Sequence, residues 1–146
     1  METIEAHGRF HAAHRQLDYA GKCAWVHGHT WRGTFAVRTE CFPRVESLDM
    51  SVDFGALKDI FKSLDHKMMV SANDGLFLGG EHFDPAGVVV IPGKNPSVEN
   101  VALYCLERAI EVLANLFPDR GIEYDMEVRI QETDNNFFTL SRTVKI

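Results

Sequence analysis

The stretch that decides the fold is Val26–Cys41, with the sequence V-H-G-H-T-W-R-G-T-F-A-V-R-T-E-C. Large apolar residues alternate here with polar ones, and a period of two predicts a β-strand that buries one face. Pro43 follows and ends the strand. The two predicted faces carry Trp31, Gly33, Phe35 and Val37 on one side, and Thr30, Arg32, Thr34 and Ala36 on the other.

Three other segments have strand-like patterns and lie toward the two ends of the chain. Residues 3–13 precede the deciding strand, and residues 123–132 and 137–146 are joined by the turn-like Asp134-Asn135-Asn136. Between them, residues 70–95 are rich in glycine, proline and asparagine and are predicted to be loop, with one short apolar run at 88–91. We therefore expect four principal strands and at most one short extra strand.

Two segments have helical spacing. Apolar residues at 54, 57, 60, 61 and 64 predict a helix over 53–64, which makes Asp53-Phe54-Gly55 a helix start. A longer apolar stripe predicts a second helix that opens at Asn95-Pro96-Ser97 and stops before Pro118. The expected fold is a single α+β domain over residues 1–146, with a four-stranded antiparallel sheet and both helices on one face.

Composition excludes several classes of function. The 146 residues carry a net charge of −6, and a nucleic-acid binder would need a basic face. No run of about 18 apolar residues predicts a membrane span, and the N-terminus lacks an apolar signal core. Three cysteines are too few and of the wrong parity for a disulfide framework. We expect a cytoplasmic protein that binds neither nucleic acid nor membrane.

Three histidines suggest a metal site. His27 and His29 project from the same face of a strand because side chains alternate, and His14 in F-H-A-A-H sits on a neighbouring strand. Three imidazoles and one open position are typical of catalytic zinc, whereas structural zinc has four protein ligands. The His-Gly-His pair alone would only be suggestive. The isolated His7, His11 and His82 are interpreted as surface or hydrogen-bonded residues.

Cys23 precedes the histidine pair by four residues and is the candidate reactive thiol. A free cysteine is most often a small buried residue, but Cys23 lies in a predicted loop after Lys22 and beside the candidate metal site, where thiolates are favoured. Cys41 and Cys105 lack such surroundings and are expected to be inert.

Further polar residues have two open interpretations each. Asp65-His66 follows the first helix and is either a helix-end histidine with a loop aspartate or a carboxylate–imidazole pair that moves protons. Glu132 is either an edge charge or a ligand-binding carboxylate. The cations Arg15, Lys22, Arg32 and Lys67 lie near these residues in sequence and form either a phosphate-binding cluster or a solvated surface.

Six short segments occur in one order along most of the chain, and together they are far more specific than any one alone. They are F-H-A-A-H-R, C-A-W-V-H-G-H-T-W, V-D-F-G-A-L-K, L-D-H-K, N-P-S-V-E-N-V-A and Q-E-T. Over residues 8–133 they resemble the 6-pyruvoyltetrahydropterin synthase / 6-carboxytetrahydropterin synthase family.

The resemblance implies a tunnelling fold that assembles into a trimeric β-barrel, as a trimer or a hexamer made of two trimers. It implies Zn²⁺ held by His14, His27 and His29, a pterin triphosphate substrate, and an active site shared between subunits. It also implies a catalytic thiol at Cys23, an aspartate–histidine pair at Asp65 and His66, and a pterin-anchoring carboxylate at Glu132.

Cys23 lies four residues before His27, and this spacing resembles that of the bacterial queuosine-pathway branch of the family. The expected enzyme is therefore a lyase, 6-carboxy-5,6,7,8-tetrahydropterin synthase. The alternatives are the pyruvoyl-forming synthase and a pterin-binding module without turnover. A generic zinc hydrolase is disfavoured because no H-E-x-x-H motif is present. Ser97-Val98, Met68-Met69-Val70 and a longer segment at 71–94 depart from the family pattern and bear mainly on substrate preference.

Overall fold

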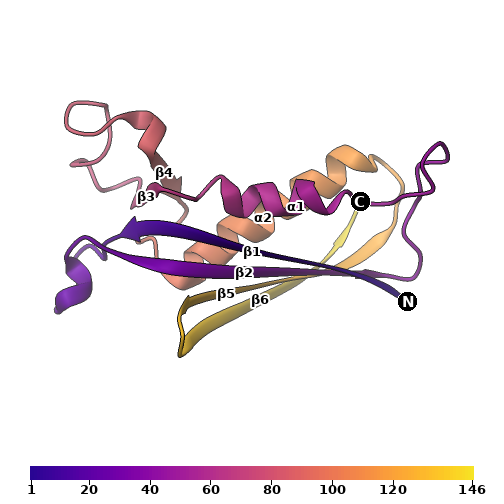
Figure 1. The fold of residues 1–146 in the computed structure, drawn as a ribbon, viewed down its shortest axis with the longest axis horizontal. Coiled ribbons are helices and arrows are strands. Elements are labelled where there is room, and N and C mark those ends of the chain that lie inside the picture. Colours follow the sequence, from indigo (N-terminus) through magenta and orange to yellow (C-terminus); the bar gives the residue numbers. More distant parts are fainter.

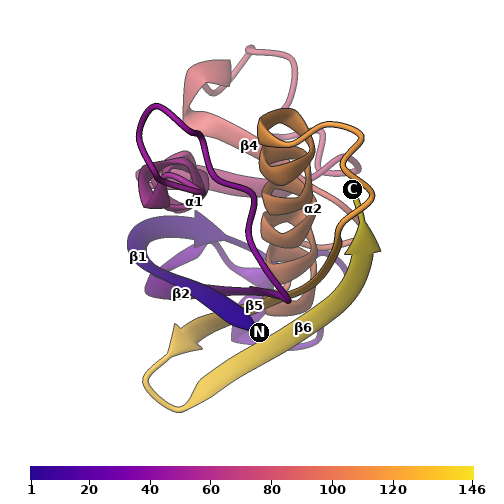
Figure 2. The same ribbon diagram turned by 90° about the vertical axis from the view of Figure 1, so that its right-hand side faces the viewer.

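Six strands form one open sheet in the order β4-β3-β1-β2-β5-β6. The computed structural model describes residues 1–146. Two helices, α1 (Phe54–Lys62) and α2 (Val98–Leu116), lie on the same face of the sheet (Figure 1, Figure 2). The strands are β1 Glu2–His14, β2 His27–Thr39, β3 Lys67–Ser71, β4 Val88–Ile91, β5 Glu123–Thr133 and β6 Asn136–Lys145.

The prediction of a four-stranded antiparallel sheet is wrong at one edge. β3 pairs in parallel with β1, and β4 pairs in parallel with β3, so the sheet is mixed and has six strands. The predicted short strand at 88–91 is β4. β3 has no period of two because its last three residues, Met69–Ser71, are all buried. The placement of both helices on one face is as predicted.

Local hydrogen bonds set where the helices begin. The Asp53 carboxylate accepts a hydrogen bond from the Gly55 backbone N–H at 2.7 Å and caps α1. The Ser97 hydroxyl accepts one from the Asn100 N–H at 3.4 Å, so α2 begins at Val98. Asn95 and Pro96 therefore precede the helix and are free to make other contacts.

A pair of glycines lets α1 approach the sheet closely. Gly8 in β1 lies opposite Gly33 in β2, and the Phe61 ring of α1 packs over both. A Cβ atom at Gly33 would lie 2.2 Å from the Phe61 ring, so no other residue fits there unless that ring shifts. Phe61 also stacks on Phe35 at 4.6 Å between ring centroids. This contact packs α1 against β2.

The β1–β2 arm projects beyond the helices at one end of the molecule. β1 ends there at His14 and β2 begins there at His27, while the two chain termini lie toward the other end (Figure 1). The loop 15–26 and the segment between β3 and β4 reach the same end, so residues far apart in sequence meet there. Neither helix has the length and apolar character that crossing a membrane requires.

Candidate metal centre

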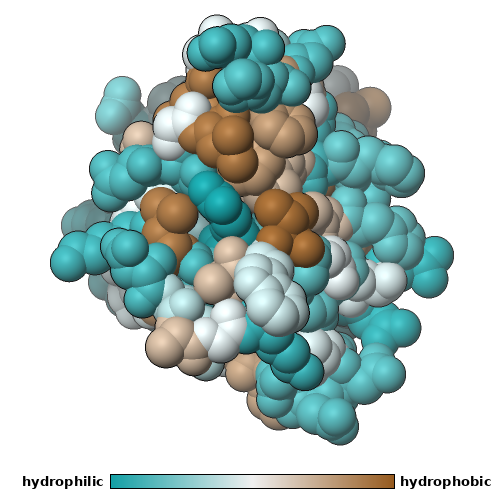
Figure 3. Space-filling model, turned by 90° about the vertical axis from the view of Figure 1, so that its left-hand side faces the viewer, coloured by the Kyte–Doolittle hydropathy of each residue, from teal (hydrophilic) through white to brown (hydrophobic).

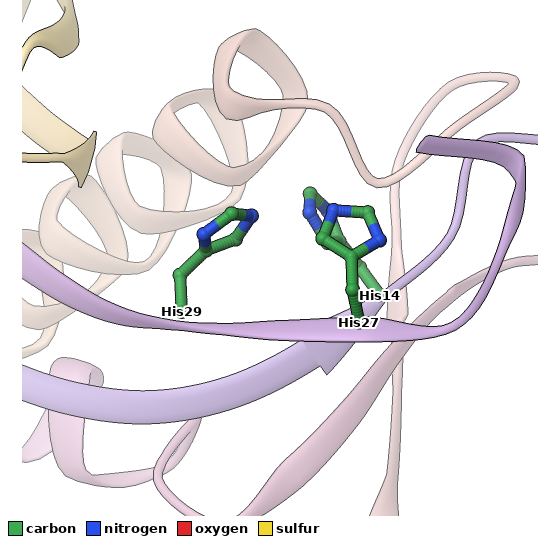
Figure 4. Close-up of side chains that lie close together, drawn as sticks. All are labelled: His14, His27 and His29. Carbon is green, nitrogen blue, oxygen red and sulfur yellow. The ribbon is translucent and has the colours of Figure 1, made fainter. Parts of the chain in front are cut away.

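The register of β1 and β2 brings three histidines together. His14 lies directly opposite His27, and His29 lies opposite Ala12 one step along the same face. One ring nitrogen from each of the three imidazoles lies within 4.8 Å of the other two. The rings point toward one another above the strands (Figure 4). This spacing allows one ion to contact all three side chains.

Two backbone carbonyls orient two of the three imidazoles, those of His14 and His27. The Nδ1–H of His14 donates to the Pro96 carbonyl oxygen at 2.7 Å, and the Nδ1–H of His27 donates to the Trp25 carbonyl oxygen at 2.7 Å. Because a carbonyl oxygen can only accept, Nδ1 carries the proton and Nε2 presents a lone pair. Metal-bound histidines almost always have such a partner on the other ring nitrogen.

Two imidazole nitrogens are buried without any hydrogen-bond partner, namely Nε2 of His14 and Nε2 of His29. A buried polar atom that lacks a partner is costly and calls for an explanation. A divalent cation would satisfy both nitrogens at once, so the donor set fits a metal. Three neutral nitrogen donors are typical of catalytic zinc sites.

Burial keeps these histidines neutral. Removal from water lowers the pKa of His14 to about 4, and the neighbouring His27 and His29 add to this effect, against the Pro96 hydrogen bond, which raises it. Burial also lowers the pKa of His29, opposed by the charge of Glu132. The lowered pKa values favour the neutral form of both rings, and the neutral imidazole is the form that binds a metal.

A cavity of about 880 Å³ opens over the three imidazoles. Its walls come from the loop 15–26, the start of α2 and the end of β5. This volume suits a small-molecule ligand. Besides the histidines it is lined by Gln16, Tyr19, Lys22, Cys23, Trp25, Val26, Asn95, Ser97, Val98, Glu99, Glu132, Thr133 and Asn136.

Cys23 and Glu132 both face this cavity. Cys23 lies half-buried on the 3-10 turn Lys22–Ala24. Glu132 lies near the end of β5 and continues the row of residues that face inward from this strand. Its Oε1 lies 3.4 Å from His14 Nε2 and 3.9 Å from His29 Nε2. The other cysteines lie elsewhere: Cys41 is exposed, and Cys105 is in the core, where burial raises the pKa of its thiol.

Asp65 and His66 form a hydrogen-bonded pair but lie away from this cavity. The Asp65 carboxylate accepts one hydrogen bond from the His11 backbone N–H at 2.7 Å and another from His66 Nδ1–H at 2.8 Å. Both bonds lower the pKa of Asp65, and the bond from His11 has the larger effect. His11 is an exposed residue between two buried ones on β1, so it projects from the opposite face of the sheet to His14. His66 packs beside it, at 6.2 Å between ring centroids.

The four cations do not gather in one place. Arg15 is bound by the buried Asp74 carboxylate at 2.6 and 2.7 Å, Lys67 binds the Ala86 carbonyl, and Arg32 projects from the opposite sheet face beside Asp134. Only Lys22 lines the cavity. The interpretation of these four cations as one phosphate-binding cluster is therefore wrong within a single chain.

Several lining residues were missed from sequence, including Asn95, Glu99 and Asn136. Asn95 and Glu99 lie on either side of Ser97, the N-cap residue of α2. The N-P-S motif predicts this helix start, and it was the signal in the sequence from which these two residues could have been found. Nothing in the spacing of residues 134–136 indicated that Asn136 would line this cavity.

Comparisons with known proteins agree on one family. A family model described as 6-pyruvoyl tetrahydropterin synthase matches residues 3–143. The 6-carboxy-5,6,7,8-tetrahydropterin synthase of Rickettsia bellii is 28% identical over 134 residues, covering 88% of this chain and 91% of that protein. The protein of the same name from Rickettsia conorii is 26% identical with the same coverage.

Solved structures share the fold. A catalytic-residue mutant of 6-pyruvoyltetrahydropterin synthase from Plasmodium vivax matches with a TM-score of 0.71 at 21% identity, covering 99% of this chain and 100% of the other. The Plasmodium falciparum synthase matches with a TM-score of 0.67 at 19% identity, covering 97% and 99%. At these identities the likeness concerns the fold.

Proposed function

We propose that this chain, which belongs to the 6-pyruvoyl tetrahydropterin synthase family, is a zinc-dependent 6-carboxy-5,6,7,8-tetrahydropterin synthase. It would convert 7,8-dihydroneopterin triphosphate and water to 6-carboxytetrahydropterin, acetaldehyde and triphosphate. One observation carries the proposal: two buried, unpartnered imidazole nitrogens face a cavity that also holds a thiol and a carboxylate. The curated relatives named above support the carboxy-forming branch.

The proposed roles follow from where the side chains lie. His14, His27 and His29 would hold the zinc, which when bound supplies Lewis acidity at one open position. Glu132 would anchor the pterin ring by accepting two adjacent N–H groups in a fork. Cys23 would remove a proton from the substrate side chain. Its position at the wall of the cavity, on a turn of the loop that leads to His27, supports this role.

Asp65 and His66 would act on a different copy of the chain. The pair is preorganised by its own hydrogen bonds, but it lies across the sheet from the cavity of its own chain. A site shared between subunits in a trimer or hexamer would bring it to the substrate bound by a neighbour. The open sheet supports such assembly, because its edge strands β4 and β6 keep unpaired backbone groups.

The surface around the cavity also supports assembly. Tyr19, Trp25 and Val26 all line the cavity and are each more than half exposed, and large apolar side chains gathered at an exposed site often mark an interaction surface. Figure 3 looks onto this end of the molecule, where several hydrophobic side chains reach the surface among hydrophilic ones. We further propose a cytoplasmic, single-domain subunit that works as a homo-oligomer.

Complementation tests the shared site. Cys23→Ala and His66→Ala proteins should each be inactive alone, whereas their co-expression in equal amounts should restore about one quarter of the wild-type activity. That fraction follows because a working site needs an intact thiol in one chain and an intact imidazole in its neighbour across a head-to-tail contact. Mixed protein no more active than either variant would place both groups in one chain and contradict the proposal.

Product analysis tests the reaction itself. Purified protein incubated with 7,8-dihydroneopterin triphosphate should release acetaldehyde in equal amount to 6-carboxytetrahydropterin. The step from Cys23 to His27 favours this branch over the pyruvoyl-forming one. Consumption of the substrate without acetaldehyde, with 6-pyruvoyltetrahydropterin as product, would contradict the assignment. Binding of the substrate without any turnover would instead support a pterin-binding module.

A further inference from the structure

Asn95 joins the loop that carries Cys23 to the start of α2. Its side-chain Oδ1 accepts a hydrogen bond from the Leu17 backbone N–H at 2.7 Å, and its Nδ2 donates to the Leu17 carbonyl at 3.2 Å. Both hydrogen-bonding groups of the Leu17 backbone are thus held by one amide. No other side chain makes two hydrogen bonds to the backbone of the loop 15–26.

Asn95 is itself held from the other side. The Asn100 side chain, in the first turn of α2, donates to the Asn95 carbonyl oxygen at 2.8 Å. Gly93 makes room for this contact, since a Cβ atom there would lie 2.5 Å from the Asn100 amide nitrogen. Gly93 also has a φ of +84°, a conformation that favours glycine. The Asn95 backbone therefore has a defined place relative to α2.

Each side of Asn95 leads to a different part of the candidate site. On one side, the next residue is the buried Pro96, whose carbonyl accepts the Nδ1–H of His14. On the other side, Leu17 follows Gln16, whose backbone N–H donates to the Cys23 carbonyl at 2.8 Å. A shift of Asn95 would therefore move both the carbonyl that orients a metal ligand and the turn that carries the thiol.

We propose that Asn95 is a positioning residue that sets the placement of the Cys23 turn relative to the His14 imidazole, with Asn100 as its support. This inference rests on the proposed function. Asn95 would act without contact to the reacting atoms, through the Pro96 carbonyl and through the Leu17 backbone. Changes to groups that orient metal ligands typically weaken metal binding by about 10–100-fold.

The test compares Asn95→Ala with Asn115→Ala, a matched change at an exposed asparagine of α2 whose side chain makes no hydrogen bond. The zinc dissociation constant is measured by competition with a chelator, and the visible spectrum is recorded with Co²⁺ in place of zinc. Asn95→Ala should bind zinc about 10–100-fold more weakly and change the Co²⁺ spectrum. Asn115→Ala should match the wild type in both.

Turnover measured at saturating zinc separates the effect on the Cys23 thiol from the effect on zinc binding. Because the Cys23 turn stays loosened when the metal is restored, Asn95→Ala should remain at least about tenfold slower than Asn115→Ala, as expected for a misplaced catalytic group. Circular dichroism of both variants checks folding. If Asn95→Ala does not fold, Asn100→Ala, which keeps the Asn95 side chain, should shift affinity and spectrum in the same direction by a smaller factor.

The outcomes separate the two claims. Wild-type zinc affinity, Co²⁺ spectrum and turnover in Asn95→Ala, or in Asn100→Ala where it is the folded variant, would overturn this inference and leave the proposed function standing. Loss of thermal stability with an unchanged spectrum would likewise overturn it, because a purely structural role has that signature. Wild-type protein that binds neither zinc nor Co²⁺ would overturn the proposed function itself.

Discussion

Cys23→Ala is expected to lower the rate of product formation by roughly 10²–10⁴-fold, the usual contribution of a positioned general base. The reason is the place of Cys23 on a short turn at the wall of the cavity that the three histidines and Glu132 also line. Its backbone is held by the hydrogen bond from the Gln16 N–H to its carbonyl oxygen, which fixes the turn at the cavity wall. Zinc content should remain that of the wild type, because the thiol is not among the grouped nitrogen donors.

Cys41→Ala is the matched control for this experiment, since Cys41 is an exposed free thiol that does not line the cavity. It should leave the rate unchanged. Product formation by Cys23→Ala at the wild-type rate would remove the thiol from the mechanism. Loss of zinc together with activity would instead make Cys23 a fourth ligand and turn the site into a closed one.

His27→Ala is expected to abolish both stoichiometric zinc and turnover. The variant would keep only two of the three imidazoles, and its effect on zinc affinity should exceed the roughly 10–100-fold that follows from changing an outer partner of a ligand. His27 is a better target than the buried His14, because its side chain is partly exposed and its loss leaves no cavity in the core. Zinc is measured by elemental analysis after gel filtration.

His82→Ala serves as the control for His27→Ala, since His82 is exposed and lies outside the cavity. Its zinc content and rate should equal those of the wild type. Retention of one zinc per chain in His27→Ala would contradict the ligand assignment, even if the activity fell.

Much of the fold could be predicted from periodicity because its main elements each have one buried face. The alternation in β2 and β5 and the apolar stripes of α1 and α2 correspond directly to residues in the core. β3 was not predicted because it has only five residues and is buried on both faces at its end. Its parallel pairing with β1 covers only two residue pairs, and such a contact leaves no pattern in the sequence.

The site was predictable where alternation alone places a side chain. His27 and His29 share a face because they are two residues apart, and that needs no tertiary information. His14 was expected as the third imidazole from a neighbouring strand, but its place directly opposite His27 depends on the register of β1, which spacing does not give. The Pro96 carbonyl and the Asn95 amide lie about 80 positions from their partners, His14 and Leu17, and no local pattern reports such contacts.

Asp65 and His66 show a different limit. Their pairing follows from adjacency, but their distance from the cavity follows from the face of β1 on which His11 lies. A sequence that predicts both the pair and the thiol cannot say whether they meet within one chain. The answer depends on a second copy, and complementation addresses it directly.

The most direct measurement is a zinc titration of metal-free protein during turnover. Protein stripped with a chelator receives increasing Zn²⁺ while triphosphate release from 7,8-dihydroneopterin triphosphate is followed. If the three imidazoles hold the working metal, the rate should rise linearly from zero and level off at one zinc per chain, and His27→Ala should stay inactive throughout. Full rate in protein whose metal content is zero by elemental analysis would contradict the account.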